Sequence, residues 1–220
     1  MRYLESFSGE ALVELGMSGY RIATPNKVRQ RKFEEALELF RSHALQSPFL
    51  RDHLQILEQE AQEIVWLKEC GVHEVFASAA YPELPGKIFV TDAIFVGLPP
   101  DVQLSGLHPY AVIENLVHES LHHDLHRQLL NRSEADGEDL ISKLQDQVRI
   151  PWRNTTWSVE KALHALKVYQ VVLHLRVWAL DELNFSTEDQ LVMQASLPTV
   201  RSIIETLSSE TKEILSDLQL

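Results

Sequence analysis

The chain contains very little cysteine: Cys70 is the only one among 220 residues. A single cysteine cannot form a disulfide within the chain, and it cannot supply the several thiolates of a structural zinc site. Residues 1–6 lack the apolar core of a secretory signal peptide. No stretch of the sequence approaches the roughly 18 consecutive apolar residues of a membrane helix. We therefore expect a cytoplasmic protein that does not span a membrane.

Positive charge is also scarce. Lys and Arg total 20 against 32 Asp and Glu, which gives a formal net charge of −12. Such a chain is poorly suited to binding nucleic acid or an anionic membrane surface, because both partners are themselves negatively charged. Hydrophobic residues make up 45% of the chain, which suits a globular core. The length predicts a single domain over residues 1–220.

The spacing of the apolar residues predicts a mainly α-helical α+β fold with a small β-sheet beside the helix that carries the motif described below. Residues 1–25 contain three glycines and Pro25, and we expect a loosely structured lead-in there with one short helical turn. Helices are predicted over about 27–45, from Pro48 to near Gly71, from Pro109 onward, from Ser158 to about Glu182, and after Pro198.

Between these helices the period of the apolar residues changes. Residues 75–78 and 87–91 predict short strands, and residues 93–96 extend the second one. Residues 131–139 are polar and acidic and predict a loop, which is followed by a short helix over 140–147.

The most informative segment is His118-Glu119-Ser120-Leu121-His122, which has the form H-E-x-x-H. Four residues of helix place both imidazoles on one face, about 6 Å apart along the axis, so that they can converge on one metal ion. Glu119 stands where zinc peptidases keep their general base. The alternative is a solvated helix face that is rich in histidine. The motif favours a metal site but does not name the reaction.

The third metal ligand must come from another segment, because three residues in line along one helix cannot reach a single ion. His126 lies about 12 Å along the axis from His118, so we expect it outside the ligand set. Leu125 and Gln128 occupy the positions where a metzincin has Gly and His, which excludes that class. Glu160 and His164, one turn apart on a later helix, are the two candidates for the third ligand.

With these residues in hand, the chain resembles a bacterial family of H-E-x-x-H proteins that occur with ribosomally made, modified peptides. Its members are described as Fe(II)- and 2-oxoglutarate-dependent peptide β-hydroxylases. The resemblance depends on four segments read in order, which are Ser78 with Leu84-Pro85-Gly86 and Ile88-Phe89-Val90, then residues 115–122, then Ile150-Pro151-Trp152-Arg153, and finally Leu163-His164-Ala165.

The resemblance implies that His118, His122 and His164 bind the metal. It also implies that Arg153 lies near the co-substrate or the peptide, where a guanidinium can hold a 2-oxoglutarate carboxylate through two parallel hydrogen bonds. The family often has a second Arg-Pro a few residues later. Here Asn154-Thr155-Thr156-Trp157 stands in that place.

The resemblance therefore implies hydroxylation of a peptide side chain, with Fe(II) and 2-oxoglutarate as cofactors. Imidazole also binds zinc, so the residues themselves leave a zinc metallopeptidase open, with Glu119 accepting a proton from a metal-bound water. A third possibility is a non-catalytic peptide-binding protein with a vestigial site. In all three cases the expected partner is a peptide.

Overall fold

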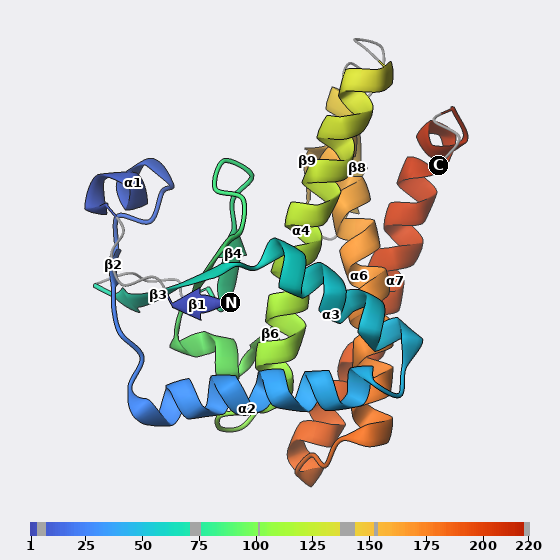
Figure 1. Cartoon of the computed structure of the whole chain (residues 1–220). Coiled ribbons are helices and arrows are strands. Elements are labelled where there is room, and N and C mark those ends of the chain that lie inside the picture. Colours follow the sequence, from blue (N-terminus) through green and yellow to red (C-terminus); the bar gives the residue numbers. More distant parts are fainter. Residues whose placement is uncertain (4–7, 71–75, 101, 137–143, 152–153, 218–220) are drawn as a thin grey trace. The chain divides into compact units, whose positions relative to one another are not determined.

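The computed structural model describes residues 1–3, 8–70, 76–100, 102–136, 144–151 and 154–217 (Figure 1). The chain divides into two compact units, residues 1–124 and 125–220, and helix α4 (Pro109–Asp136) contributes residues to both. Helices predominate, and the first unit contains a small mixed sheet. This confirms the predicted α+β class, while a single domain over the whole chain stays a prediction.

The sheet of the first unit is built around a buried central strand, β3 (Glu63–Glu69). Strands β1 (Arg2–Tyr3) and β5 (Lys87–Val90) pair parallel to it, and β2 (Tyr20–Ile22) pairs antiparallel. Strand β4 (Ser78–Ala80) pairs antiparallel with β5 and ends the order β1-β3-β5-β4. The strand predicted at 87–91 corresponds to β5. The strand predicted at 75–78 is misplaced: it shares only Ser78 with β4, residues 76 and 77 are not in a strand, and Val75 lies outside the described residues.

Two predictions for the first 71 residues are wrong. Residues 1–25 do not form a loose lead-in, because they supply strands β1 and β2, whereas the one short helical turn predicted there corresponds to helix α1 (Gly9–Glu14). The helix predicted to run from Pro48 to near Gly71 ends at Glu60, and the segment after it forms β3. Residues 63–67 are all buried. A continuous buried run has no polar face, so its periodicity does not distinguish a strand from a helix.

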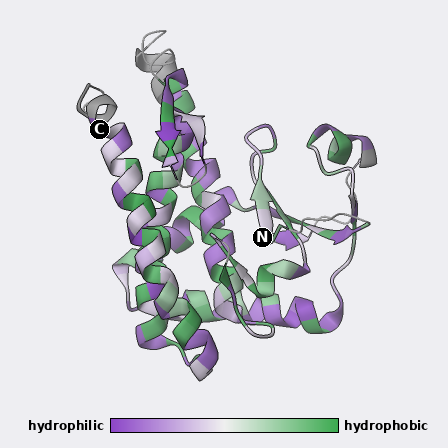
Figure 2. Ribbon diagram, turned by 180° about the vertical axis from the view of Figure 1, so that it is seen from behind, coloured by the Kyte–Doolittle hydropathy of each residue, from purple (hydrophilic) through white to green (hydrophobic). Residues whose placement is uncertain are grey.

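Helices α2 (Lys27–Ala44) and α3 (Pro48–Glu60) begin where the sequence predicts them. The side chain of Asn26 caps α2 by accepting from the Arg29 N–H, and Ser47 caps α3 in the same way. Helix α2 buries Phe33, Ala36, Phe40 and Ala44 at helical spacing. Hydrophobic and hydrophilic residues accordingly alternate around α2 (Figure 2).

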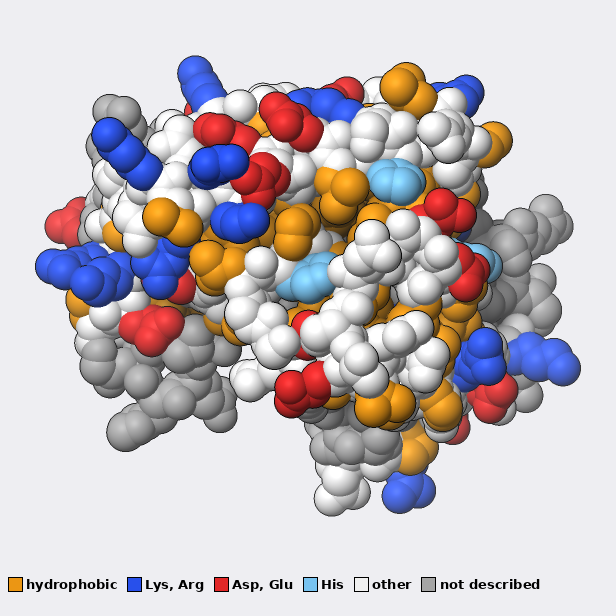
Figure 3. All heavy atoms as spheres, turned by 90° about the horizontal axis from the view of Figure 1, so that it is seen from below, with side chains coloured by type: hydrophobic (Ala, Val, Ile, Leu, Met, Phe, Trp, Pro, Cys, Tyr) orange, Lys and Arg blue, Asp and Glu red, His pale blue; other side chains and the backbone are white. Residues whose placement is uncertain are grey.

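The face of the molecule seen from below carries Lys, Arg, Asp and Glu side chains mixed together (Figure 3).

After β5 the chain turns toward α4 through short elements. Residues 93–96 do not extend the strand: the 3₁₀ helix η1 (Asp92–Phe95) begins there, and the Thr91 hydroxyl caps it by accepting from the Ala93 N–H. Strands β6 (Gly97–Leu98) and β7 (Val102–Gln103) then form a small antiparallel ribbon. The side chain hydroxyl of Thr91 favours the helical turn over a longer strand because it satisfies a backbone donor at the start of η1.

The second unit consists of the last part of α4, β8 (Gln147–Ile150) paired with β9 (Thr155–Ser158), α6 (Val159–Glu182) and α7 (Thr187–Asp217). Apolar side chains from β8, α6 and α7, among them Ile150, Ala162 and Leu207, form one core cluster. Ser158 caps α6 as the sequence predicts. No helix of the described residues is long and apolar enough to cross a membrane.

The sequence places three boundaries of the second unit wrongly. The predicted loop from 131 is helical as far as Asp136, and its remaining residues lie outside the described ones. Half of the helix predicted over 140–147 lies outside them too; residues 144 and 145 are helical, and Gln147 already belongs to β8. The last helix begins at Thr187 and contains Pro198. A proline inside a helix removes one backbone donor, and the long apolar contact surface of α7 outweighs that loss.

Candidate metal centre

The H-E-x-x-H motif lies in the first unit, on a part of α4 that is held firmly by burial. Residues 110–117 are all buried, and so are Ser120 and Leu121. Helix α4 starts at Pro109, whose fixed φ and missing N–H suit the first helical position. Because the helix is anchored on its apolar sides, the directions of its polar side chains are fixed. His118 and His122 are half-buried and stand one turn apart.

The two histidines face each other. Their ring centroids are 4.9 Å apart, and their Nε2 atoms are 3.1 Å apart. Two nitrogens bound to one metal at about 2.1 Å, with an angle between about 90° and 109° at the metal, lie roughly 3.0–3.4 Å apart. The observed separation fits that range. The two nitrogens are within hydrogen-bonding distance of each other, and the same separation allows them to supply two ligands of a single ion.

Glu119 is held by a polar network that joins α4 to the sheet. Both N–H groups of the Asn115 amide donate to backbone carbonyls, to Gly97 at 2.7 Å and to Ala111 at 2.8 Å. This fixes the amide so that Oδ1 faces Ser78, whose Oγ lies 3.1 Å from it and 2.8 Å from Glu119 Oε1. The Ala80 N–H also donates to the Glu119 carboxyl group.

The protonation of Glu119 decides how this network is satisfied. Ser78 has one hydrogen to donate and two acceptor oxygens within reach. If Glu119 is ionised, Ser78 can donate to Glu119 or to Asn115 but not to both. If Glu119 carries a proton, it donates to Ser78, and Ser78 donates to Asn115. Burial raises the pKa of Glu119 from 4.5 to about 7, although the bonds from Ser78 and Ala80 oppose the shift. Burial therefore outweighs the two hydrogen bonds that favour the ionised form of Glu119.

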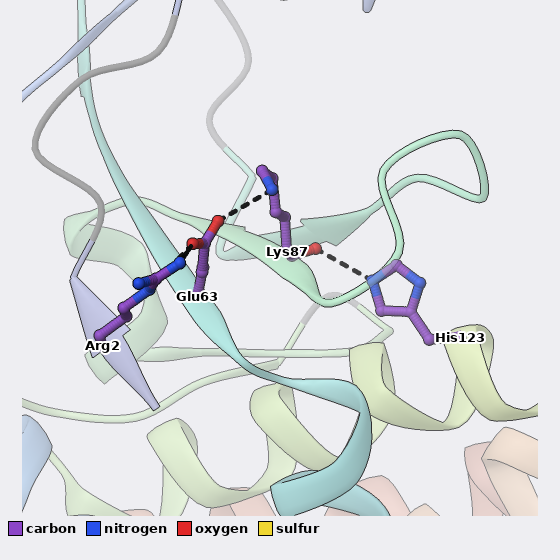
Figure 4. Close-up of polar contacts among 4 residues, drawn as sticks. All are labelled: Arg2, Glu63, Lys87 and His123. Atoms are coloured by element: carbon purple, nitrogen blue, oxygen red, sulfur yellow. Dashed lines mark hydrogen bonds and ion pairs between the residues drawn. The ribbon is translucent and has the colours of Figure 1, made fainter.

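His123 fixes the same face of α4 one turn later. Its Nε2 donates to the Lys87 carbonyl oxygen at 3.0 Å, and Lys87 Nζ lies 2.8 Å from Glu63 (Figure 4). Arg2 binds the same carboxylate, and these two cations hold the pKa of Glu63 below its usual value. Asn115, Glu119 and His123 thus form a polar stripe at intervals of four residues that binds α4 to the sheet.

A pocket of about 420 Å³ opens beside the motif within the first unit. Glu119 and His118 line it together with Ser78 and Asn115. The remaining wall comes mainly from the segment around β6 and β7, with the residues Ala77, Gly97, Leu98, Pro99, Val102 and Gln103. This volume is in the range of ligand-binding pockets, and polar and apolar groups together line it.

The other predicted site residues belong to the second unit. His126 Nδ1 lies 3.8 Å from Glu160 Oε1, and burial lowers the pKa of His164, while Glu160 acts in the opposite direction. A lowered pKa keeps His164 neutral, which is the form that binds a metal. Among the residues that the structure describes, no group of three or more His, Cys, Asp or Glu forms a metal-binding set. His164 as the third ligand stays a prediction, and Arg153 lies outside the described residues.

Sequence reasoning did not assign a role to Asn115, Ser78 or His123. A signal for two of them exists, because Asn115 and His123 stand four residues before and after Glu119 on the predicted helix. Polar residues at that interval share one helix face. No such signal exists for Ser78, which is 41 positions from its partner Glu119.

No known family model matches the chain, and a search of curated proteins gives no match either.

Proposed function

We propose that this chain is a metal-dependent enzyme that modifies a peptide, and specifically a non-haem Fe(II)- and 2-oxoglutarate-dependent hydroxylase of a peptide side chain. The observation that carries the metal site is the 3.1 Å separation of the His118 and His122 Nε2 atoms beside a buried Glu119 and a pocket. The choice of iron and of 2-oxoglutarate depends on the resemblance of the four sequence segments. The proposed location is the reducing cytoplasm, where the exposed Cys70 persists as a thiol.

In this proposal His118, His122 and His164 hold the ion, and Arg153 binds a carboxylate of 2-oxoglutarate through its guanidinium fork. Bound iron with 2-oxoglutarate supplies the oxidation of a C–H bond by molecular oxygen. Glu119 is held by Ser78 and the Ala80 N–H next to the first ligand. With a pKa of about 7, it can hold or release a proton near neutral pH. The apolar part of the pocket excludes water from the substrate side chain.

The test begins with anaerobic addition of Fe(II) and 2-oxoglutarate to the metal-free protein. A charge-transfer band in the visible is expected for the native chain and for His126→Ala, and it should be lost in His118→Ala. Admission of oxygen should then release succinate, and a peptide substrate should gain about 16 Da. Absence of the band together with absence of succinate would reject the hydroxylase. Stoichiometric metal in His164→Ala would remove that residue from the ligand set and favour Glu160.

The second candidate is a zinc metallopeptidase, and the position of Glu119 is the specific observation that favours it. A carboxyl group with a pKa of about 7 beside two metal ligands is suited to accept a proton from a metal-bound water. This enzyme would cleave a peptide without oxygen, and Glu119→Gln would abolish the cleavage. Cleavage products under anaerobic zinc conditions, with no mass gain under iron and oxygen, would replace the hydroxylase by the peptidase.

A non-catalytic peptide-binding protein with a vestigial site is the third candidate. It would bind peptide and retain metal but give neither succinate nor cleavage. The same two experiments therefore separate all three proposals.

A further inference from the structure

We infer that the pocket beside the H-E-x-x-H motif receives an uncharged side chain of the peptide substrate, and that the 2-oxoglutarate dianion does not bind in it. The inference deepens the proposed function and rests on it for the assumption of a peptide substrate. It concerns only residues of the first unit. The argument depends on which charges the pocket offers and on which of its polar groups are already satisfied.

The first step concerns charge. None of the described residues that line the pocket is Lys or Arg, and the only ionisable side chains among them are His118 and Glu119. In the metal-free protein a dianion would therefore lose water there without gaining a basic partner. Carboxylates in binding sites are normally held by Arg or Lys through charge-assisted hydrogen bonds. The described side chains of the pocket thus offer no basic partner to 2-oxoglutarate.

The second step concerns the polar groups of the wall. The Asn115 amide donates both hydrogens to backbone carbonyls, and its oxygen faces Ser78. Ser78 and the Ala80 N–H are engaged with Glu119. These groups already have partners within the protein, so a charged side chain of the substrate would find few hydrogen bonds there. Either sign of charge is consequently disfavoured against an apolar or weakly polar side chain.

The third step concerns shape. Leu98, Pro99 and Val102 give part of the wall apolar surface. A Cβ added to Gly97 would lie only 3.4 Å from Ala77 Cβ and 3.3 Å from the Ala93 carbonyl oxygen. Gly97 is therefore already closely packed against Ala77 and Ala93. Gln103 is exposed and lines the pocket, which makes it the position where a charge can be introduced without disturbing the core.

The experiment follows the backbone amide resonances of Gly97, Val102 and Gln103 in the full-length, metal-free protein by NMR. The probes are the blocked tripeptides acetyl-Gly-X-Gly-amide with X as Leu, Asp or Lys, and 2-oxoglutarate itself. The leucine peptide should shift these resonances and bind at least about fivefold tighter than either charged peptide, because removing either charge from water without a partner costs at least the roughly 1 kcal/mol that this factor represents. 2-Oxoglutarate should leave the resonances unchanged.

Two variants, each of which adds one positive charge, complete the test. Gln103→Lys should improve binding of the aspartate peptide about fivefold, whereas Gln55→Lys, an exposed position on α3, should leave all affinities as in the native protein. The inference is overturned if 2-oxoglutarate shifts the pocket resonances, if a charged peptide binds as well as the leucine peptide, or if none binds. A missing charge-transfer band with iron, together with the expected peptide preference, would reject the hydroxylase and keep the side-chain pocket.

Discussion

Replacing Glu119 by glutamine should stabilise the metal-free protein above neutral pH and leave its stability nearly unchanged at about pH 5. Glu119 is only 7% exposed, and its pKa lies at about 7 instead of 4.5. Between these two pH values the folded chain holds the proton of Glu119 and the unfolded chain releases it. The unfolded state then binds fewer protons, so the free energy of unfolding falls as the pH rises through this window.

The size of the effect follows from the pKa. One pKa unit corresponds to about 1.4 kcal/mol, so ionised Glu119 lowers the stability of the native protein by roughly 3 kcal/mol at pH 8 and by less than about 1 kcal/mol at pH 5. Glutamine cannot ionise, but its amide has two N–H donors where the protonated acid has one O–H, which costs about 1 kcal/mol at every pH. The net gain is about 2 kcal/mol at pH 8 and close to zero at pH 5.

The assay is urea unfolding of both proteins in the presence of a chelator at pH 5 and pH 8. The difference in unfolding free energy is taken at unchanged m-value. Glu38→Gln is the matched control, because Glu38 is exposed on α2; its effect should be small and equal at the two pH values. An effect of Glu119→Gln that is also equal at both pH values would refute the argument that burial keeps Glu119 protonated.

His118→Ala should abolish tight metal binding because it removes one of two converging nitrogens, whereas His126→Ala should leave the metal in place; metal analysis after gel filtration decides between them. His164→Ala should also lose the metal, and full retention would show that the third ligand lies elsewhere. Asn115→Ala should destabilise the protein by roughly 2–3 kcal/mol, since two donated bonds and one accepted bond are lost in a buried place; a change in the urea midpoint corresponding to less than about 0.5 kcal/mol would contradict this. Arg153→Leu should weaken 2-oxoglutarate binding, measured by calorimetry on the iron-loaded protein, without loss of metal, and an unchanged affinity would exclude Arg153 as the carboxylate partner.

Local sequence signals determined the helices that begin at a capping residue. Asn26, Ser47 and Ser158 each stand directly before a helix and accept a backbone N–H three residues later. The spacing of His118 and His122 is also a local property, because four residues of helix bring the two rings to one face wherever the helix lies. These features depend on interactions within a few residues, and they can therefore be predicted from the chain alone.

The sheet and the surroundings of Glu119 were decided by tertiary structure. Strand β1 pairs with β3 across 61 positions, from Arg2 to Glu63, and two-residue strands leave no periodic pattern in the sequence. The pKa of Glu119 depends on burial beneath a strand that brings Ser78 to it from 41 positions away. A carboxyl group next to a histidine on an exposed helix would ionise as in water. Only packing against the sheet removes that water, so the sequence names the residues of the motif while the fold sets their protonation.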